Sequence, residues 1–116
     1  MTVRFVNQPS NYRKLIGEMI NETTVWKSGK ENIDLIHFFT NSTAELEEKL
    51  PEMKEQIKKN GCIWVSWFKK TSGKSSELND HIVRDTALAL GLVDVKVCSV
   101  SDDWSGQKLV YRLRDR

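Results

Sequence analysis

The stretch Ile33-Asp34-Leu35-Ile36-His37-Phe38-Phe39 decides the fold class, because it is almost continuously apolar over a length typical of a strand. A strand of this kind is covered on both faces, as the strands of parallel sheets are. A second stretch, Cys62-Ile63-Trp64-Val65-Ser66-Trp67-Phe68, has the same character. We therefore expect the two segments to be neighbouring parallel strands, with helices packed on the sheet.

Before the first of these strands, the chain alternates between strand and helix patterns. Val3-Arg4-Phe5-Val6 predicts a strand, and apolar residues three and four positions apart predict a helix near Tyr12 to Asn21. Thr23-Thr24-Val25-Trp26 predicts a short further strand. The direction of that strand stays open, because the connection to Ile33 is long enough for a parallel return and short enough for a hairpin.

Between the two apolar strands, the residues predict a helix. Ser42-Thr43-Ala44-Glu45 has the pattern of a capping box, in which the serine accepts a backbone N–H bond and Glu45 reaches back to the cap. Pro51 predicts a kink or the start of a second helical piece. Asn60-Gly61 predicts the end of the helix, at a residue in the left-handed conformation. The expected apolar face of the helix comprises Leu46, Leu50, Met53 and Ile57.

After the second apolar strand, a polar loop from Lys69 to Ser76 leads to a predicted helix from Glu77 to Leu90. Two alternating segments then follow, Val93 to Cys98 and Leu109 to Arg114, and they predict strands with one wetter face near a sheet edge. The connection between them, Ser101 to Gly106, is too short for a covering helix, so we expect an antiparallel pair.

The resulting order of elements predicts an α/β fold: a three-layer Rossmann-like sandwich whose sheet is mostly parallel with an antiparallel C-terminal strand pair. The 116 residues fit one domain, residues 1–116. No apolar run is long enough to span a membrane, and the strand pattern at the amino terminus leaves no room for a signal peptide, so we expect a cytoplasmic protein. A formal charge of +2 is too small to indicate nucleic acid as a partner.

Two motifs lie at predicted strand ends. The first is Trp64-x-x-Trp67-x-Lys69-Lys70-x-Ser72-Gly73, and the second is Gly91-Leu92-Val93-Asp94-x-Lys96-Val97-Cys98 followed by Trp104-Ser105-Gly106-x-Lys108. They resemble a family of small bacterial proteins known only as a domain of unknown function. The resemblance covers roughly Ile33 to Arg112, with a weaker match at Phe5-Val6-Asn7-x-Pro9-x-x-Tyr12. It implies no known activity, and the family typically shows proline where this chain has Phe68.

A more distant resemblance is to the later part of Rossmann-type methyltransferases, which also finish in an antiparallel strand pair. It rests on Ile33-Asp34-Leu35-Ile36, a helix, Lys58-Lys59-Asn60-Gly61 and a strand. Binding of S-adenosylmethionine needs a glycine-rich turn after the first strand and an acid that ends the second. Here the turn is Asn7-Gln8-Pro9-Ser10, without glycine, and Lys27 follows the second strand. We therefore expect no cofactor.

The loop after the second apolar strand carries Ser72-Gly73-Lys74-Ser75, which is similar to the end of a phosphate-binding P-loop. The full pattern requires glycine where Phe68 stands, so a nest of backbone N–H groups is not expected. Lys69, Lys70 and Lys74 nevertheless surround the amino end of the following helix, where the helix dipole favours an anion. The loop thus predicts either an anion site or a solvated basic turn.

The segment Asp102-Asp103-Trp104-Ser105-Gly106-x-Lys108 carries more polar groups than a turn needs. We favour a structural interpretation, in which an aspartate closes an Asx turn, Gly106 takes a positive φ and Trp104 folds over the sheet end. The alternative is a contact with a ligand. If the hairpin points toward the carboxyl ends of the parallel strands, it borders the same crevice as the Lys69 loop.

Other candidate chemistry is weak. Cys62 and Cys98 lie in apolar strand patterns and predict buried reduced thiols, while a disulfide between them needs adjacent strands in matched register. With His37 and His81 at unrelated spacings, no metal site is expected. We interpret His37 as a hydrogen-bonded core histidine, because it lies in a run expected to be buried. Neither histidine has a serine or cysteine with an orienting acid at a recognisable spacing, so the sequence does not support a nucleophilic triad.

The predicted elements thus make up a complete fold, but the sequence does not supply a recognisable set of catalytic residues. We expect a non-catalytic module that binds a small anionic ligand or a protein partner through loops at the strand ends. The candidate site residues are Asn7, Pro9, Lys69, Lys70, Ser72, Lys74, Asp103, Trp104 and Ser105. The alternative is a minimal nucleotide- or S-adenosylmethionine-dependent transferase. A third hypothesis is a homodimer formed through an edge strand.

Overall fold

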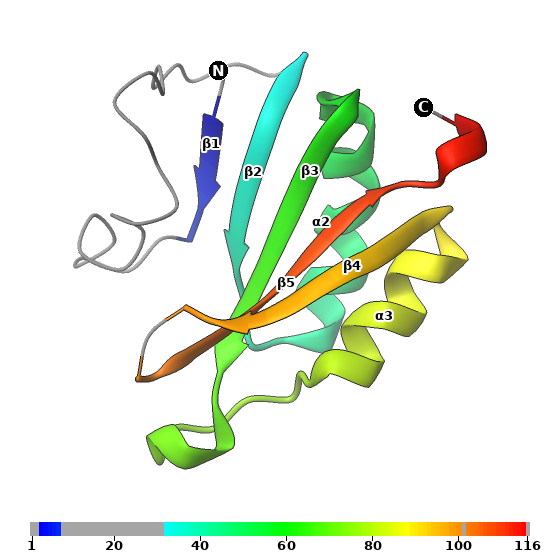
Figure 1. Cartoon of the computed structure of the whole chain (residues 1–116). Helices are drawn as coiled ribbons and strands as arrows, with labels where there is room; N and C mark the ends of the chain where they lie inside the picture. Colours follow the sequence, from blue (N-terminus) through cyan, green and yellow to red (C-terminus); the bar gives the residue numbers. More distant parts are fainter. Residues whose placement is uncertain (1–2, 8–31, 101, 116) are drawn as a thin grey trace.

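The structure, a computed structural model, describes residues 3–7, 32–100 and 102–115. Along these residues the elements are β1 (Val3–Val6), β2 (Ile33–Phe39), α2 (Thr43–Gln56), β3 (Ile57–Phe68), α3 (Asp80–Ala89), β4 (Leu92–Ser99) and β5 (Trp104–Tyr111), shown in Figure 1. Short 3₁₀ turns span Lys70–Ser72 and Leu113–Asp115. The helix expected near Tyr12 to Asn21, the strand expected at Thr23 to Trp26, and Pro9 lie outside the described residues.

The strands form a five-stranded mixed sheet with the order β1-β2-β3-β5-β4. Strands β1, β2 and β3 are parallel, and β5 is antiparallel to both β3 and β4. The register joins Ile36 to Ile63 and Phe38 to Val65. The two apolar stretches are therefore parallel neighbours, and the C-terminal pair is antiparallel, as predicted.

Helices α2 and α3 pack on one face of this sheet, behind it in the view of Figure 1. Leu46 and Leu50 of α2 and Val83 of α3 are fully buried against Ile63 and Leu109 of the sheet. Each such side chain contributes roughly 1.5–3 kcal/mol when it leaves water. This apolar layer holds the helices in place.

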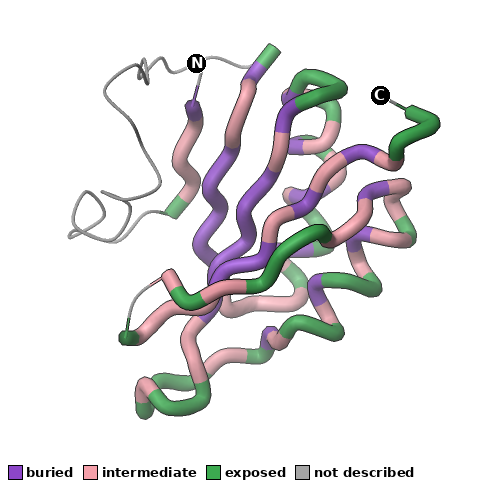
Figure 2. Tube along the Cα trace, in the orientation of Figure 1, coloured by how far each residue is buried: buried purple, intermediate pink, exposed green. Residues whose placement is uncertain are grey.

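The opposite face of the two central strands is buried as well. Side chains alternate along a strand, so His37, Phe39, Trp64 and Ser66 point away from the helices, and all of them are buried. Figure 2 shows the resulting buried stripe along β2 and β3. The side chains on both faces of these two strands are therefore buried.

The predicted end of the first described helix is wrong. Ser42 Oγ accepts a hydrogen bond from Glu45 N at 3.2 Å, so the cap is confirmed, and α2 continues through Pro51 as one helix. It ends at Gln56, however, and residues 57–61 belong to β3. A Cβ on Gly61 would lie 2.9 Å from Asp34 O, so this glycine allows β2 and β3 to approach closely instead of stopping a helix.

Other boundaries differ because of tertiary contacts. Helix α3 begins at Asp80, with Asn79 as its cap, and Glu77 Oε1 instead accepts a hydrogen bond from Thr43 N at the start of α2 at 2.9 Å. Gly106 lies inside β5 and is absent from the positive-φ residues of the described chain, contrary to prediction. A Cβ there would meet Val100 Cγ2 at 2.7 Å. The alternation predicted to continue to Leu113 and Arg114 also ends early, because both lie in the final 3₁₀ turn.

No helix among the described residues is long and apolar enough to cross a membrane.

Candidate functional site

The carboxyl ends of four strands lie along one edge of the sheet. Strands β1, β2 and β3 are parallel, and β4 runs in the same direction as β3 because both are antiparallel to β5. The segments that leave this edge, at the bottom of Figure 1, include the Lys69 loop and the β4–β5 turn. Ligands of open α/β sheets bind at this edge. We call it the carboxyl edge.

The Lys69 loop and the β4–β5 turn are joined directly. Lys69 N donates to Asp103 O at 2.8 Å, and Lys69 Nζ donates to Ser99 Oγ at 2.5 Å. Lys74 Nζ lies 3.4 Å from Asp103 Oδ2 and 5.1 Å from the centre of the Phe68 ring. Three residues predicted for the site, Lys69, Lys74 and Asp103, are therefore brought together by elements distant in sequence.

Ser72 stabilises the loop from within. Its Oγ donates to Lys69 O at 2.7 Å and accepts from Lys74 N at 3.1 Å, while Gly73 takes a φ of 76°. Because the hydroxyl is used inside the loop, Ser72 is a structural residue here. The left-handed conformation of Gly73 closes the turn.

The other side of the loop is held by Asn41, which the sequence analysis missed. Asn41 Oδ1 accepts a hydrogen bond from Phe68 N at 2.7 Å, and Asn41 O accepts one from Glu77 N at 3.0 Å. Asn41 directly follows the end of the β2–β3 pairing, where Thr40 N donates to Ser66 O. In the sequence, the available signal was an asparagine directly after a buried strand. Its partners could not be predicted, because they depend on which strand lies beside β2 in the sheet.

A cavity of about 320 Å³ opens beside this junction. Its walls combine apolar rings, two lysines and one carboxylate. The lining residues are Trp67, Phe68, Lys69, Lys70, Thr71, Leu78, Asn79, Asp80, Val97 and Ser105. Lys69, Lys70 and Ser105 were predicted for the site, whereas Trp67, Asp80 and Val97 were not.

Trp104 packs at the end of the sheet. Its ring lies 5.0 Å from that of Phe39 in an edge-on contact and 4.4 Å from that of Phe68, measured between centroids. Trp104 is paired with Phe68 on the face opposite the helices. The predicted structural role of this tryptophan is therefore confirmed, and it does not line the cavity.

Asn7 lies at a different place on the same edge. It adopts a left-handed φ of 58°, and its Nδ2 donates to Glu45 Oε1 at 2.9 Å at the start of α2. Strand β2 stands between β1 and β3. The described contacts thus join Asn7 to α2 rather than to the lysines, and Glu45 binds Asn7 instead of completing the capping box.

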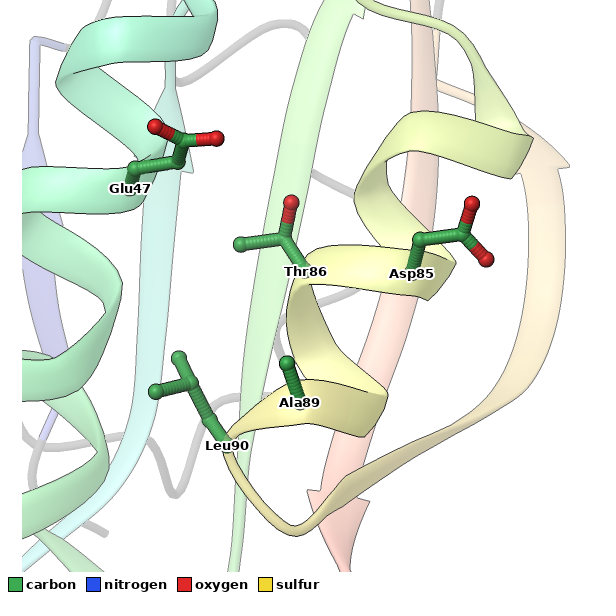
Figure 3. Close-up of a pocket in the computed structure, with 5 residues that line it drawn as sticks. All are labelled: Glu47, Asp85, Thr86, Ala89 and Leu90. Carbon is green, nitrogen blue, oxygen red and sulfur yellow. The ribbon is translucent and has the colours of Figure 1, made fainter.

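A second cavity, of about 370 Å³, lies between α2 and α3. It is lined by Glu47, Asp85, Thr86, Ala89 and Leu90, drawn in Figure 3. The two carboxylates stand apart in this view, with Thr86 between them, and Thr86 Oγ1 donates to Ile82 O. This open groove carries no convergent set of polar groups.

His37 is a core residue. Its Nε2 lies 2.7 Å from Ser66 Oγ, and its ring stacks on Phe39 at 4.2 Å between centroids. Burial lowers the pKa of His37 from 6.5 to about 3, so the imidazole is neutral at pH 7. Since Ser66 is fully buried, the pair does not meet a substrate, and the predicted hydrogen-bonded core histidine is confirmed.

Both cysteines are free thiols. Strand β5 separates Cys62 on β3 from Cys98 on β4, which explains why they do not pair. Burial raises the pKa of the Cys62 thiol, so it is protonated at neutral pH. Within the described ranges, no group of three or more His, Cys, Asp or Glu side chains is arranged to hold a metal ion.

The fold is similar to the Rossmann-like folds of several methyltransferases. A putative type 11 methyltransferase from Sulfolobus solfataricus is 14% identical, with a TM-score of 0.61 over 96% of this chain and 84% of that one. Magnesium protoporphyrin IX methyltransferase from Synechocystis, with bound S-adenosylmethionine, is 7% identical, with a TM-score of 0.64 over 97% and 70%. Mitomycin 7-O-methyltransferase is 7% identical, with a TM-score of 0.63 over 96% and 48%. At these identities the likeness concerns the fold alone.

Residues 7–113 match the family described as a protein of unknown function, DUF3052. The chain belongs to this family. No curated protein matches the chain.

Proposed function

We propose that the protein is a non-catalytic binding module that holds a small anionic ligand in the cavity beside Lys69 and Lys70. The observation that carries the proposal is the junction at the carboxyl edge, where Lys69 is bound through both its backbone and its side chain to the β4–β5 turn, next to the cavity. A rigid wall of this kind reduces the entropy lost on binding.

The size and lining of the cavity support a small ligand with an apolar body. A volume of about 320 Å³ lies at the lower end of the range for small-ligand sites. Trp67, Phe68 and Leu78 supply the apolar wall. The lining includes no cysteine, so it offers no thiol nucleophile.

The charge of the loop supports an anion. Lys74 is already opposite Asp103, and Lys69 Nζ is bound to Ser99, whereas Lys70 is exposed and has no ion-pair partner among the residues that the structure describes. Lys70 is therefore the side chain best able to meet an incoming anionic group.

Isothermal titration tests the proposal with 3-phenylpropionate, an apolar carboxylate, and with inorganic phosphate. We expect 3-phenylpropionate to bind and Lys70→Ala to weaken that binding by about tenfold, since a hydrogen bond to a charged group is lost. Lys96→Ala is the matched control, because Lys96 is an exposed lysine of β4 outside the cavity lining, and it should leave binding unchanged. Absence of heat with both probes would exclude the proposal.

A second candidate is a minimal nucleotide- or S-adenosylmethionine-dependent transferase. It is supported by the structures of similar fold, one of which holds bound S-adenosylmethionine. Asn7 supplies the left-handed φ of 58° that a glycine would otherwise provide after β1, but it retains a side chain, and that side chain is held by Glu45. The described residues therefore fit the cofactor only in part.

Thermal-shift measurements with S-adenosylmethionine and ATP separate the two candidates. Stabilisation by either compound that is lost in Lys69→Ala and Lys70→Ala favours the transferase. No shift, together with binding of 3-phenylpropionate, favours the module.

Further features of the molecule belong to the same proposal. We infer a third layer over the face that carries His37, Phe39 and Trp64, because these residues are buried and the pattern near Tyr12 to Asn21 predicts a helix. Residues 1–116 would then form one domain of a cytoplasmic bacterial protein.

A homodimer through β4 also stays a proposal. Strand β4 ends the sheet, and Val95 and Val97 on it are half-exposed. The register shift between Asp94 and Lys96 interrupts the edge, so residues 92–94 and 96–99 offer regular backbone groups to a second copy as two separate segments. Sedimentation at increasing concentration tests it, and a monomer throughout would contradict it.

A further inference from the structure

Strand β4 ends the sheet, so among the described strands it has a neighbour, β5, on one side only. Over residues 96–99 its pairing with β5 is regular. Every second residue of such a segment directs its backbone N–H and C=O groups away from the sheet. Lys96 is exposed and Val97 is 52% exposed, although neighbouring side chains point to opposite faces. This open side of β4 is therefore accessible from both faces.

The open side of β4 adjoins the cavity at the carboxyl edge. Val97 lines this cavity from β4, Ser105 lines it from β5 and Trp67 lines it from β3. Ser105 is paired with Trp67 on one side and with Ser99 on the other. The cavity thus extends across three neighbouring strands and reaches the edge strand of the sheet.

A positive charge lies where β4 ends. Lys69 Nζ donates to Ser99 Oγ at 2.5 Å, and Ser99 is the last residue of β4. The cavity lining carries two lysines, Lys69 and Lys70, against one carboxylate, that of Asp80. A chain that ran along β4 and ended here would therefore be favoured if its terminal group were a carboxylate. Such a chain has its carboxyl end beside that of β4, so it runs parallel to β4.

We propose that the protein binds the extended C-terminal segment of a partner protein, which adds to β4 as a parallel strand and places its terminal carboxylate beside Lys69 and Lys70. The last side chain of the segment is apolar and enters the cavity against Trp67 and Leu78. In this mode of recognition, backbone hydrogen bonds supply affinity and a pocket for a side chain supplies specificity.

This inference rests on the proposed anion-binding function and names its ligand. The small anion with an apolar body is then the last residue of a peptide. A free anion of this size would occupy the cavity and leave the open side of β4 unused, whereas a peptide uses both.

Isothermal titration with three matched probes tests the inference. The first is the peptide acetyl-Thr-Ser-Thr-Ser-Val-Phe with a free carboxylate, the second is the same peptide with a C-terminal amide, and the third is N-acetyl-L-phenylalanine, which keeps the carboxylate and the ring but has no strand. We expect the free-acid peptide to bind about tenfold more tightly than either of the others, because each lacks one set of hydrogen bonds. Lys70→Ala should weaken the free-acid peptide and N-acetyl-L-phenylalanine alike.

Hydrogen exchange of single backbone amides locates the peptide. Within residues 96–98, the amide groups that face the open side of β4 should exchange more slowly when the free-acid peptide is bound, because an added strand gives them a hydrogen-bond partner. N-acetyl-L-phenylalanine is the matched control and should leave these amides unchanged.

The outcomes distinguish this inference from the function on which it rests. Equal binding of the peptide and N-acetyl-L-phenylalanine, with unchanged exchange in residues 96–98, would overturn strand addition and leave the anion site standing. Absence of heat with the peptide, N-acetyl-L-phenylalanine and 3-phenylpropionate would overturn both. An amidated peptide that binds as tightly as the free acid would overturn the role of the terminal carboxylate. A dimer whose residues 96–98 are already protected without peptide would also overturn the inference, because a second copy would then cover β4.

Discussion

The face of the sheet under α2 and α3 and the carboxyl edge are stabilised in different ways. The face is a continuous apolar layer in which Leu46, Leu50 and Val83 are fully buried. The edge is joined by a few polar contacts, such as those between Lys69, Ser99 and Asp103. Apolar burial adds up over many atoms, whereas polar contacts near water contribute little each. The face can therefore carry the stability of the protein, which leaves the edge free for binding.

The largest expected effect is in the apolar layer. Leu46→Ala should lower the free energy of unfolding by about 2–5 kcal/mol, because it removes buried methyl groups and leaves a cavity. Urea denaturation measures the change. Leu113→Ala is the matched control, since Leu113 is 80% exposed and its truncation should change stability very little. Similar losses in both variants would mean that the layer does not carry the stability.

The second effect concerns pH and the buried His37. Because its folded pKa is lowered to about 3 while the unfolded value stays near 6.5, the unfolded state binds more protons between these values. Stability from His37 is thus fully present above the unfolded pKa and is lost as pH falls, with a slope of at most about 1.4 kcal/mol per pH unit.

Urea midpoints between pH 7 and pH 4.5 check this slope in the wild type and in His37→Gln. The variant should show the shallower slope. His81→Gln changes an exposed helical histidine and serves as control. If His37→Gln kept the wild-type slope, the pH dependence of stability would arise from other titratable groups.

An intermediate effect is expected at the β2–β3 contact. Gly61→Ala should destabilise the fold by about 1–3 kcal/mol, because the new Cβ would meet the backbone oxygen of Asp34 at 2.9 Å. Thermal melting measures the loss. A Cβ on Gly73 would meet nothing within 4 Å, but its φ of 76° disfavours a side chain, so Gly73→Asn is the tolerated comparison. An unchanged melting temperature in Gly61→Ala would contradict the close approach.

The smallest effect is expected at the edge. Asp103→Ala removes the ion pair with Lys74, in which both side chains are about half exposed, and should lower stability by less than about 1 kcal/mol. The backbone bond from Lys69 to Asp103 O does not depend on the side chain. The contribution of the ion pair is measured from melting temperatures at low and high salt. The difference in melting temperature between Asp103→Ala and the wild type should shrink as the salt concentration rises. A loss as large as that of Leu46→Ala would abolish the contrast between the two regions.

The parts predicted correctly from the sequence depend on local patterns. The capping serine Ser42, the central strand Ile33–Phe39 and the core role of His37 each follow from residues close together in the chain. The errors fall where a distant segment overrides a local preference. Asn60-Gly61 is a good helix stop by itself, yet pairing with β2 draws it into β3.

The candidate site was predicted only in part for the same reason. The lysines after β3 were visible in the sequence, and the end-of-sheet position of Trp104 was expected. The partners Ser99 and Asn41 and the lining residues Trp67 and Asp80 were not found, because each acquires its role through a neighbour supplied by another element.

The sequence by itself determined the α/β class, the parallel pairing of its two apolar strands and the antiparallel end of the sheet, because hydrophobic periodicity and short connections are local properties of the chain. Only the tertiary structure decided that β5 lies between β3 and β4, that the β4–β5 turn reaches Lys69, and that a cavity opens beside that junction. These features depend on strand order and register, which arise from the packing of the whole sheet.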